Sequence, residues 1–185
     1  RSIDLLAEKI ERPPQEIKAD VLEFFKGRMQ NLLHSQGLSP DVIDAALAVG
    51  FDDLVDLRER AKALHDLKEV PDFEPLAIAF KRVVNISKAH IPGEVDTGQF
   101  ENSCEQALFE AYREIAKRAE ERTSRKDYPS ALKELSLLRQ PVDEFFNGVL
   151  VMAEDEKIRN NRLSLLRKIA ALFFKIGDFS KITTA

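Results

Sequence analysis

The sequence predicts an all-α fold, a helical bundle, and three observations support this prediction. Only seven of the 185 residues are glycine, β-branched residues rarely occur in runs, and no useful length of chain alternates apolar with polar residues. The composition, 44% hydrophobic and 32% charged, is typical of a chain that buries a core. No uncharged apolar stretch approaches the roughly 20 residues of a membrane span, so we expect a soluble, cytoplasmic protein. Because the sequence begins with Arg1, we also expect it to be a piece of a longer chain.

Proline and glycine divide the first 74 residues into helices. Pro14 suits the first position of a helix, where its missing N–H is not needed. Gly37 is typical of a residue that ends a helix as its C-cap. Ser39 and Pro40 then suit the N-cap and the first position of the next helix. The expected helices cover residues 3–10, 14–34, 40–48 and 52–67. We interpret residues 1–74 as a helical segment that precedes the main domain.

The second part of the chain repeats its apolar residues at helical spacing. Phe73, Leu76, Phe80 and Val83 fall within one stripe of a helix, and that stripe should face the core. Residues 90–99, with one proline and two glycines, should form a loop. The expected helices cover residues 73–89, 100–122, 127–138, 141–151 and 155–176. The short connections between them favour antiparallel packing in a bundle.

The residue types that support metal, redox or hydrolytic chemistry are scarce. One cysteine and three scattered histidines offer neither a disulfide nor the spacing of a zinc site. Cys104 is most simply a small core residue, and Asp53 with its acidic neighbours is explained by capping at a helix start. His65 and Asp66 lack the further ligands that a phosphohydrolase site would need. We therefore expect a noncatalytic chain without a metal or cofactor of its own.

The charge is unevenly distributed along the chain. Residues 1–74 carry 10 Lys and Arg against 16 Asp and Glu, a net charge of −6. Residues 75–185 carry 18 against 16, a net charge of +2. The overall net charge of −4 therefore leaves room for a basic patch in the second part, where a nucleic acid could bind.

Several segments of this second part resemble one known family. They are Leu-Arg-Gln-Pro-Val-Asp-Glu-Phe-Phe at residues 138–146, Val-Leu-Val-Met-Ala-Glu-Asp-Glu at 149–156, Ile-Arg-Asn-Asn-Arg-Leu at 158–163, and Ala-Phe-Lys-Arg-Val-Val-Asn-Ile at 79–86. Together they resemble the C-terminal end of the β-subunit of bacterial, heterotetrameric glycyl-tRNA synthetase, over roughly residues 75–180. The first seventy residues look like the helical stretch that precedes this end.

The resemblance implies a fold and a function. Residues 75–185 would form a helical anticodon-binding domain of the type found in arginyl-type class I tRNA synthetases. The domain would help the synthetase hold tRNA-Gly by its anticodon arm, together with the α-subunit and the rest of the β-subunit. Glycine activation, with the ATP and Mg²⁺ that the whole enzyme uses, would belong to the α-subunit.

The helix at residues 73–89 carries the first candidate RNA-binding surface. Lys81, Arg82, Asn85 and Lys88 lie on the side away from the apolar stripe, with Asn85 nearly opposite its centre. The cations would attract phosphates, and the Asn amide can both donate to and accept from a base edge or a 2′-hydroxyl. The alternative is an ordinary solvated helix face.

The most basic window, residues 157–168, carries the second candidate surface. It holds five cations and no carboxylate. Arg162 falls inside the core stripe, so we expect a structural ion pair with a carboxylate such as Asp143 or Asp155. The side chains expected to face RNA phosphates are Lys157, Asn160, Ser164, Arg167 and Lys168. Their alternative role is to keep the surface soluble.

A third basic stretch lies near the end of the expected helix 100–122. It comprises Arg113, Lys117, Arg118, Arg122, Arg125 and Lys126, diluted by three glutamates to a net charge of +3. Tyr128, in the turn that follows, is a candidate stacking platform for a base. The alternative is that its ring simply packs at a helix start.

Two functions therefore compete. The leading hypothesis is a tRNA-binding module without catalytic residues. The alternative is a helical protein–protein docking module whose acidic first part contacts another protein or domain, with no RNA contact. Salt-dependent binding of an isolated anticodon stem-loop would distinguish them.

Overall fold

The computed structural model describes residues 13–91 and 93–184, and over these residues it confirms the all-α prediction, with helices and turns but no strand. The α-helices are α2 (Pro14–Ser35), α3 (Pro40–Leu47), α4 (Leu54–Lys68), α5 (Phe73–Ser87), α6 (Ser103–Ser124), α7 (Tyr128–Ser136), α8 (Arg139–Gly148) and α9 (Glu156–Phe173). Two short 3-10 turns are η1 (Thr97–Gln99) and η2 (Phe179–Lys181). The expected helix at 3–10 lies outside the described residues.

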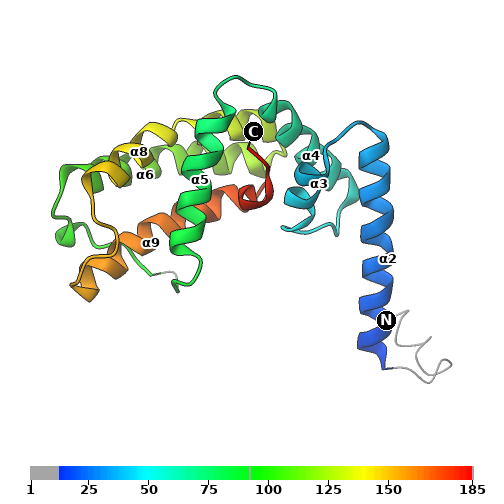
Figure 1. The fold of residues 1–185 in the computed structure, drawn as a ribbon, viewed down its shortest axis with the longest axis horizontal. Helices are drawn as coiled ribbons and strands as arrows, with labels where there is room; N and C mark the ends of the chain where they lie inside the picture. The colour runs from blue at the N-terminus through cyan, green and yellow to red at the C-terminus, as the bar shows by residue number, and fades with distance from the viewer. Residues whose placement is uncertain (1–12, 92, 185) are drawn as a thin grey trace.

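The helices form a bundle with one projecting arm (Figure 1). α5 to α9 form one packed group, in which α5 crosses α9 and also packs against α8. α4 joins this group by packing on α7, and α3 joins it through α4 and η2. α2 projects at one end of the molecule and packs against α3 (Figure 1).

Side-chain caps explain where several helices begin. Asp53 accepts hydrogen bonds from the backbone of Val55 and Asp56 at the start of α4, as expected for an acidic cap. α6 begins at Ser103 rather than at residue 100, because Asn102 and Glu105 form a capping box. Ser39 precedes α3 but does not cap it, since its hydroxyl donates to the carboxylate of Asp41 instead.

A continuous hydrophobic core runs through the bundle. The expected core face of α9 is confirmed, because Leu165, Ile169 and Leu172 are buried, as is Ile176 just beyond the helix. The rings of Phe80, Phe173 and Phe179 are fully buried and bring together α5, α9 and η2. One cluster of buried side chains forms this core, and its members lie between Leu33 and Ile182 in the sequence. The cluster includes residues of α3 and α4 as well as of α5 to α9.

Candidate nucleic-acid interface

The outward face of α5 holds the first predicted RNA-binding residues. Arg82, Asn85 and Lys88 are exposed and Lys81 is half-buried, while Val83 and Val84 of the same helix are buried. Among the described residues, the side chains of Lys81, Asn85 and Lys88 have no hydrogen-bond or ion-pair partner. The Arg82 guanidinium instead lies 4.0 Å from the ring centre of Phe146 on α8, where a cation–π contact holds it.

The predicted RNA-binding residues on α9 also include some side chains without a partner and others that are paired or buried. Lys157 and Asn160 are exposed and Arg167 is half-buried, and none of the three has a side-chain partner in the described part of the chain. Lys168 is ion-paired, with its Nζ 3.1 Å from a carboxylate oxygen of Glu94. Ser164, expected to face outward, is only 4% exposed, and that expectation is wrong.

The loop between α5 and η1 covers Ser164. His90, just beyond the end of α5, has its Nε2 2.9 Å from the Ser164 hydroxyl. Further along the loop, Asp96 donates its backbone N–H to the Asn161 amide oxygen at 2.8 Å, and its carbonyl accepts from the Asn161 amide nitrogen at 2.9 Å. These bonds hold the C-terminal end of α5 beside α9. The loop therefore ties together the two helices that carry the predicted RNA surfaces.

Arg162 lies inside the bundle and forms an ion pair, but not with the expected carboxylates. Its side chain is 6% exposed, and its Nε donates at 2.9 Å to Glu105, which is 1% exposed. The same guanidinium also binds Glu101 at 3.0 Å and the carbonyl of Leu150 at 3.0 Å. The hydrogen bond with Glu105 raises the pKa of Arg162 despite the opposing effect of burial.

The expectation of an Asp143 or Asp155 partner is wrong for a local reason. Asp155 caps the first turn of α9, accepting from the backbone of Lys157 and Ile158. Asp143 lies 3.6 Å from the Nε of Arg139 on its own helix. Glu105 is 57 residues from Arg162 in sequence, so helical periodicity contains no signal for their contact.

Most of the third basic stretch is neutralised within the molecule. Arg118 binds Glu114 and Glu134. The other pairs are Arg122 with Asp127, Arg125 with Glu121, and Lys126 with Asp53. Arg113 lies 5.9 Å from the ring centre of Phe109. In the described part of the chain only Lys117 of this stretch has a side chain without a partner, so the stretch presents little free charge to RNA.

Tyr128 is not the stacking platform that the sequence suggested, because its ring is 4% exposed. Its hydroxyl donates to Asp56 on α4, and burial together with this hydrogen bond raises the pKa of Tyr128. Burial by itself would raise the pKa of Asp56, but the hydrogen bonds from Tyr128 and Arg60 lower it. The side chain therefore packs at the start of α7 and ties that helix to α4.

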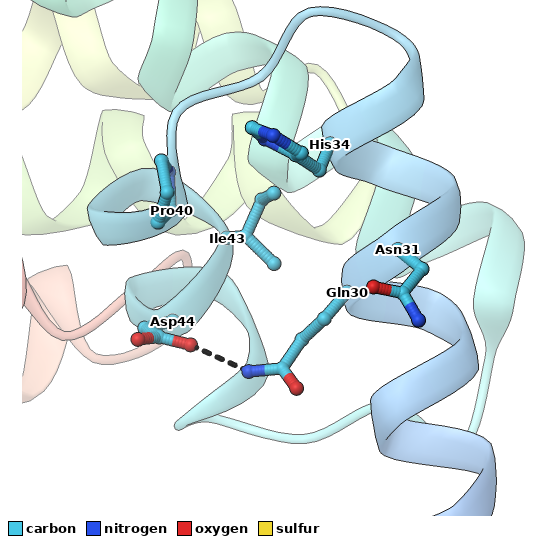
Figure 2. A pocket seen from close by; sticks show the side chains of 6 residues that line it. All are labelled: Gln30, Asn31, His34, Pro40, Ile43 and Asp44. Atoms are coloured by element: carbon cyan, nitrogen blue, oxygen red, sulfur yellow. Dashed lines mark hydrogen bonds between the residues drawn. The ribbon is translucent and has the colours of Figure 1, made fainter.

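A cavity of about 200 Å³ lies between α2 and α3, away from these residues (Figure 2). Gln30 reaches across it and donates to Asp44 at 2.8 Å, and the ring of His34 lies above Ile43 (Figure 2). The His34 Nδ1 is 3.4 Å from the carbonyl of Leu38. The hydrogen bond between Gln30 and Asp44 joins α2 to α3, and the cavity contains none of the predicted site residues.

The described residues lack both a metal-binding cluster and a membrane-spanning helix. They contain no group of three or more His, Cys, Asp and Glu side chains that could hold a metal ion. None of their helices combines the length and the apolar character needed to cross a membrane.

Known proteins resemble this chain closely. Residues 76–184 match the family described as the DALR anticodon binding domain. Three relatives are similar to the whole chain over 182 residues. They are the glycine–tRNA ligase beta subunits of Syntrophus aciditrophicus, Syntrophotalea carbinolica and Geobacter metallireducens, which are 46%, 47% and 48% identical to this chain. The match covers 98% of the chain but 26% of each relative, so the chain spans about a quarter of their length.

Proposed function

The chain belongs to the DALR anticodon-binding domain family, and on this premise we propose that residues 75–185 hold a tRNA by its anticodon arm. One observation carries the proposal: within the matched range, α5 and α9 pack on each other, and each presents exposed polar side chains that have no partner among the described residues. Lys81, Lys88 and Lys157 supply positive charge for phosphates, and Asn85 and Asn160 supply amides for bases. Arg82, Arg167 and Lys168 flank these five residues on the same two helices.

We further propose that the RNA is tRNA-Gly and that the chain is the C-terminal part of a synthetase β-subunit. The names of its relatives support this assignment. Its partners would then be the α-subunit and the rest of the β-subunit, in the cytoplasm. ATP and Mg²⁺ would bind elsewhere in that enzyme. This part would bind RNA without catalysing a reaction.

The proposal is tested by titrating the anticodon stem-loop of a glycine tRNA with the chain at several salt concentrations. Lys81→Ala and Lys88→Ala should weaken binding to every stem-loop alike, and each should reduce the salt slope by about 0.7. Asn85→Ala should instead reduce the discrimination between the glycine loop and a mutated loop, because an amide reads a base edge.

Lys62→Ala is the matched control for charge. Lys62 is exposed, has no side-chain partner in the described part of the chain, and lies on α4, which packs on α3, α5 and α7. The Lys62→Ala variant should bind the stem-loop with unchanged affinity and an unchanged salt slope. A chain that binds no stem-loop, or binding that Lys62→Ala weakens as much as Lys81→Ala does, would contradict the proposal.

A specific feature of α2 favours a second function for the first segment, as a docking surface. Five large apolar side chains are exposed along this helix, namely Val21, Leu22, Phe24, Phe25 and Leu32. Phe24 is 59% exposed, so water contacts most of its surface. We propose that this face packs against another part of a longer β-subunit.

This second function is tested by mixing the chain with the remaining part of a relative's β-subunit and measuring their association by sedimentation. Phe24→Asp should weaken the association and leave stem-loop binding intact. Equal association of the wild-type and variant chains would contradict it.

A further inference from the structure

Two neighbouring cavities, both wide open to solvent, flank Lys157 in the region where the loop covers α9. The first, about 340 Å³, lies under the loop, with His90 and Asn160 in its walls. The second, about 410 Å³, lies beside the first turn of α9, with Phe100 and Ile158 in its walls. Gln99 and Lys157 line both cavities, so these two side chains form their shared boundary.

The first cavity is held in shape by buried polar contacts. Asn161 and Ser164, which form part of its wall, are buried, and both are hydrogen-bonded to the loop. Gln99 is positioned by a hydrogen bond to the carboxylate of Asp96 at 3.1 Å. The amide of Asn160 has no partner among the described residues. A ligand that enters would therefore meet a preformed wall and one free amide.

The second cavity offers an aromatic surface. The ring of Phe100 is half-buried and packs edge-to-face on Phe109, with 5.8 Å between the ring centres. That contact fixes the ring while part of its surface stays accessible. A fixed and accessible aromatic ring is a stacking platform for a nucleobase.

The charges of the two cavities give a bound nucleotide its orientation. Glu94 and Asp96 line the first cavity, and Glu101 and Asp155 line the second. These carboxylates repel a phosphate, and each already accepts a hydrogen bond from within the molecule. The exposed ammonium of Lys157 is the only cationic group among the residues that line either cavity. A base would therefore point inward and the phosphate would stay at Lys157.

We propose that the two cavities take the bases of two consecutive unpaired ribonucleotides, with their linking phosphate at Lys157. This inference rests on the proposed function, because it places these nucleotides in the anticodon loop. Unpaired loops are read in this way, with bases splayed apart, stacked on aromatic rings and hydrogen-bonded at their edges. Lys157 then contributes affinity, Asn160 reads one base, and Phe100 stacks on the other.

The test combines protein variants with stem-loops of a glycine tRNA in which one loop nucleotide at a time is abasic. The variants are Asn160→Ala, Phe100→Leu and Lys157→Ala, with Lys62→Ala as the control. If Asn160 contacts one base, then Asn160→Ala and removal of that base should each weaken binding roughly 5- to 150-fold, and their combination should cost no more than either alone. Phe100→Leu, which keeps an apolar side chain, should show the same coupling at the adjacent nucleotide.

Lys157→Ala should behave differently, weakening binding to all stem-loops equally and reducing the salt slope by about 0.7. Circular dichroism melts would show that each variant is folded. In one contrary outcome, the wild-type chain binds the stem-loop while the fold-losses in affinity from Asn160→Ala and from base removal multiply at every loop position. That result would overturn the two-cavity inference and leave the proposed function standing. Coupling of Asn160 and Phe100 to nucleotides that are not neighbours would also overturn it. A wild-type chain that binds no stem-loop would overturn both.

Discussion

Ion pairs in this molecule differ in how far they are removed from water, and burial decides what each contributes to stability. Arg162 and Glu105 are both buried, and each satisfies the other's charge. Arg125 and Glu121 form a pair at 2.8 Å, but both side chains are more than half exposed. Solvent and salt screen such an exposed pair, so it contributes little. Removing one partner of the buried pair leaves an uncompensated charge in the core.

The first prediction concerns this buried pair. Arg162→Gln should lower the free energy of unfolding by about 3 to 5 kcal/mol, because Glu105 would stay buried without its partner. The double variant Arg162→Met with Glu105→Gln should lose less than the sum of the two single variants. Denaturant unfolding measures all three. Arg125→Gln is the control and should have almost no effect, and an Arg162→Gln variant as stable as this control would contradict the prediction.

At the scale of elements, single carboxylates join helices that are distant in sequence. Asp41 on α3 accepts from Lys68 on α4 at 2.7 Å and from the backbone N–H and hydroxyl of Thr183 at 2.7 and 2.8 Å. Burial would raise the pKa of Asp41, but these bonds and one from Ser39 lower it well below its usual range. The ionised carboxylate thus ties α3 to α4 and to the C-terminal tail, and its protonation weakens these contacts.

The second prediction follows from the sign of this shift. A carboxyl whose pKa is lowered by folding contributes stability that is complete above its unfolded pKa, about 3.9, and is lost as the pH falls toward the folded value. Asp41→Asn should therefore be less stable than the wild type at neutral pH, and the difference should shrink below about pH 4. Urea unfolding across this pH range measures the effect. A difference that stays constant into acid would show that the charge of Asp41 is not its source.

At the scale of the whole molecule, the sequence-based boundary between residues 74 and 75 crosses a continuous core. Leu64 of α4 and Ile169 of α9 are both fully buried in the same cluster. A side chain added at Gly177 would meet Leu64 at 2.6 Å, so the tail and α4 are in close contact. The hydroxyl of Tyr128 and the ammonium of Lys126 bind the N-terminal end of α4 from the other side of that boundary. The packing therefore leads us to expect that both segments unfold together.

The third prediction tests this expectation. Leu64→Ala and Ile169→Ala should each cost about 2 to 5 kcal/mol, as the loss of a buried aliphatic side chain does elsewhere. Both should shift one and the same cooperative transition in calorimetry. A thermogram in which Leu64→Ala moves one transition and Ile169→Ala moves another would instead support two domains divided near residue 74.

Much of this structure can be predicted from the sequence, because the patterns that indicate helices and buried faces lie within short stretches of the chain. Apolar residues at helical spacing, with Pro40, Gly50 and Pro71 between them, indicated the helices to within a few residues. The same periodicity placed Asn85 on the outer face of α5 and Ile169 in the core, where both are found. The family, too, was recognisable from short runs of residues such as 138–146, and the comparisons show it. All of these depend on neighbours within a few positions along the chain.

Only the tertiary structure decided which distant residues meet. The partner of Arg162 is Glu105 rather than Asp155, Ser164 is covered by the loop that His90 begins, and Tyr128 is buried against Asp56. Each of these contacts joins residues 57 to 74 positions apart. Helical periodicity gives the direction of a side chain relative to its own helix. It does not specify which other helix or loop packs there, because that depends on how all the apolar faces are buried together.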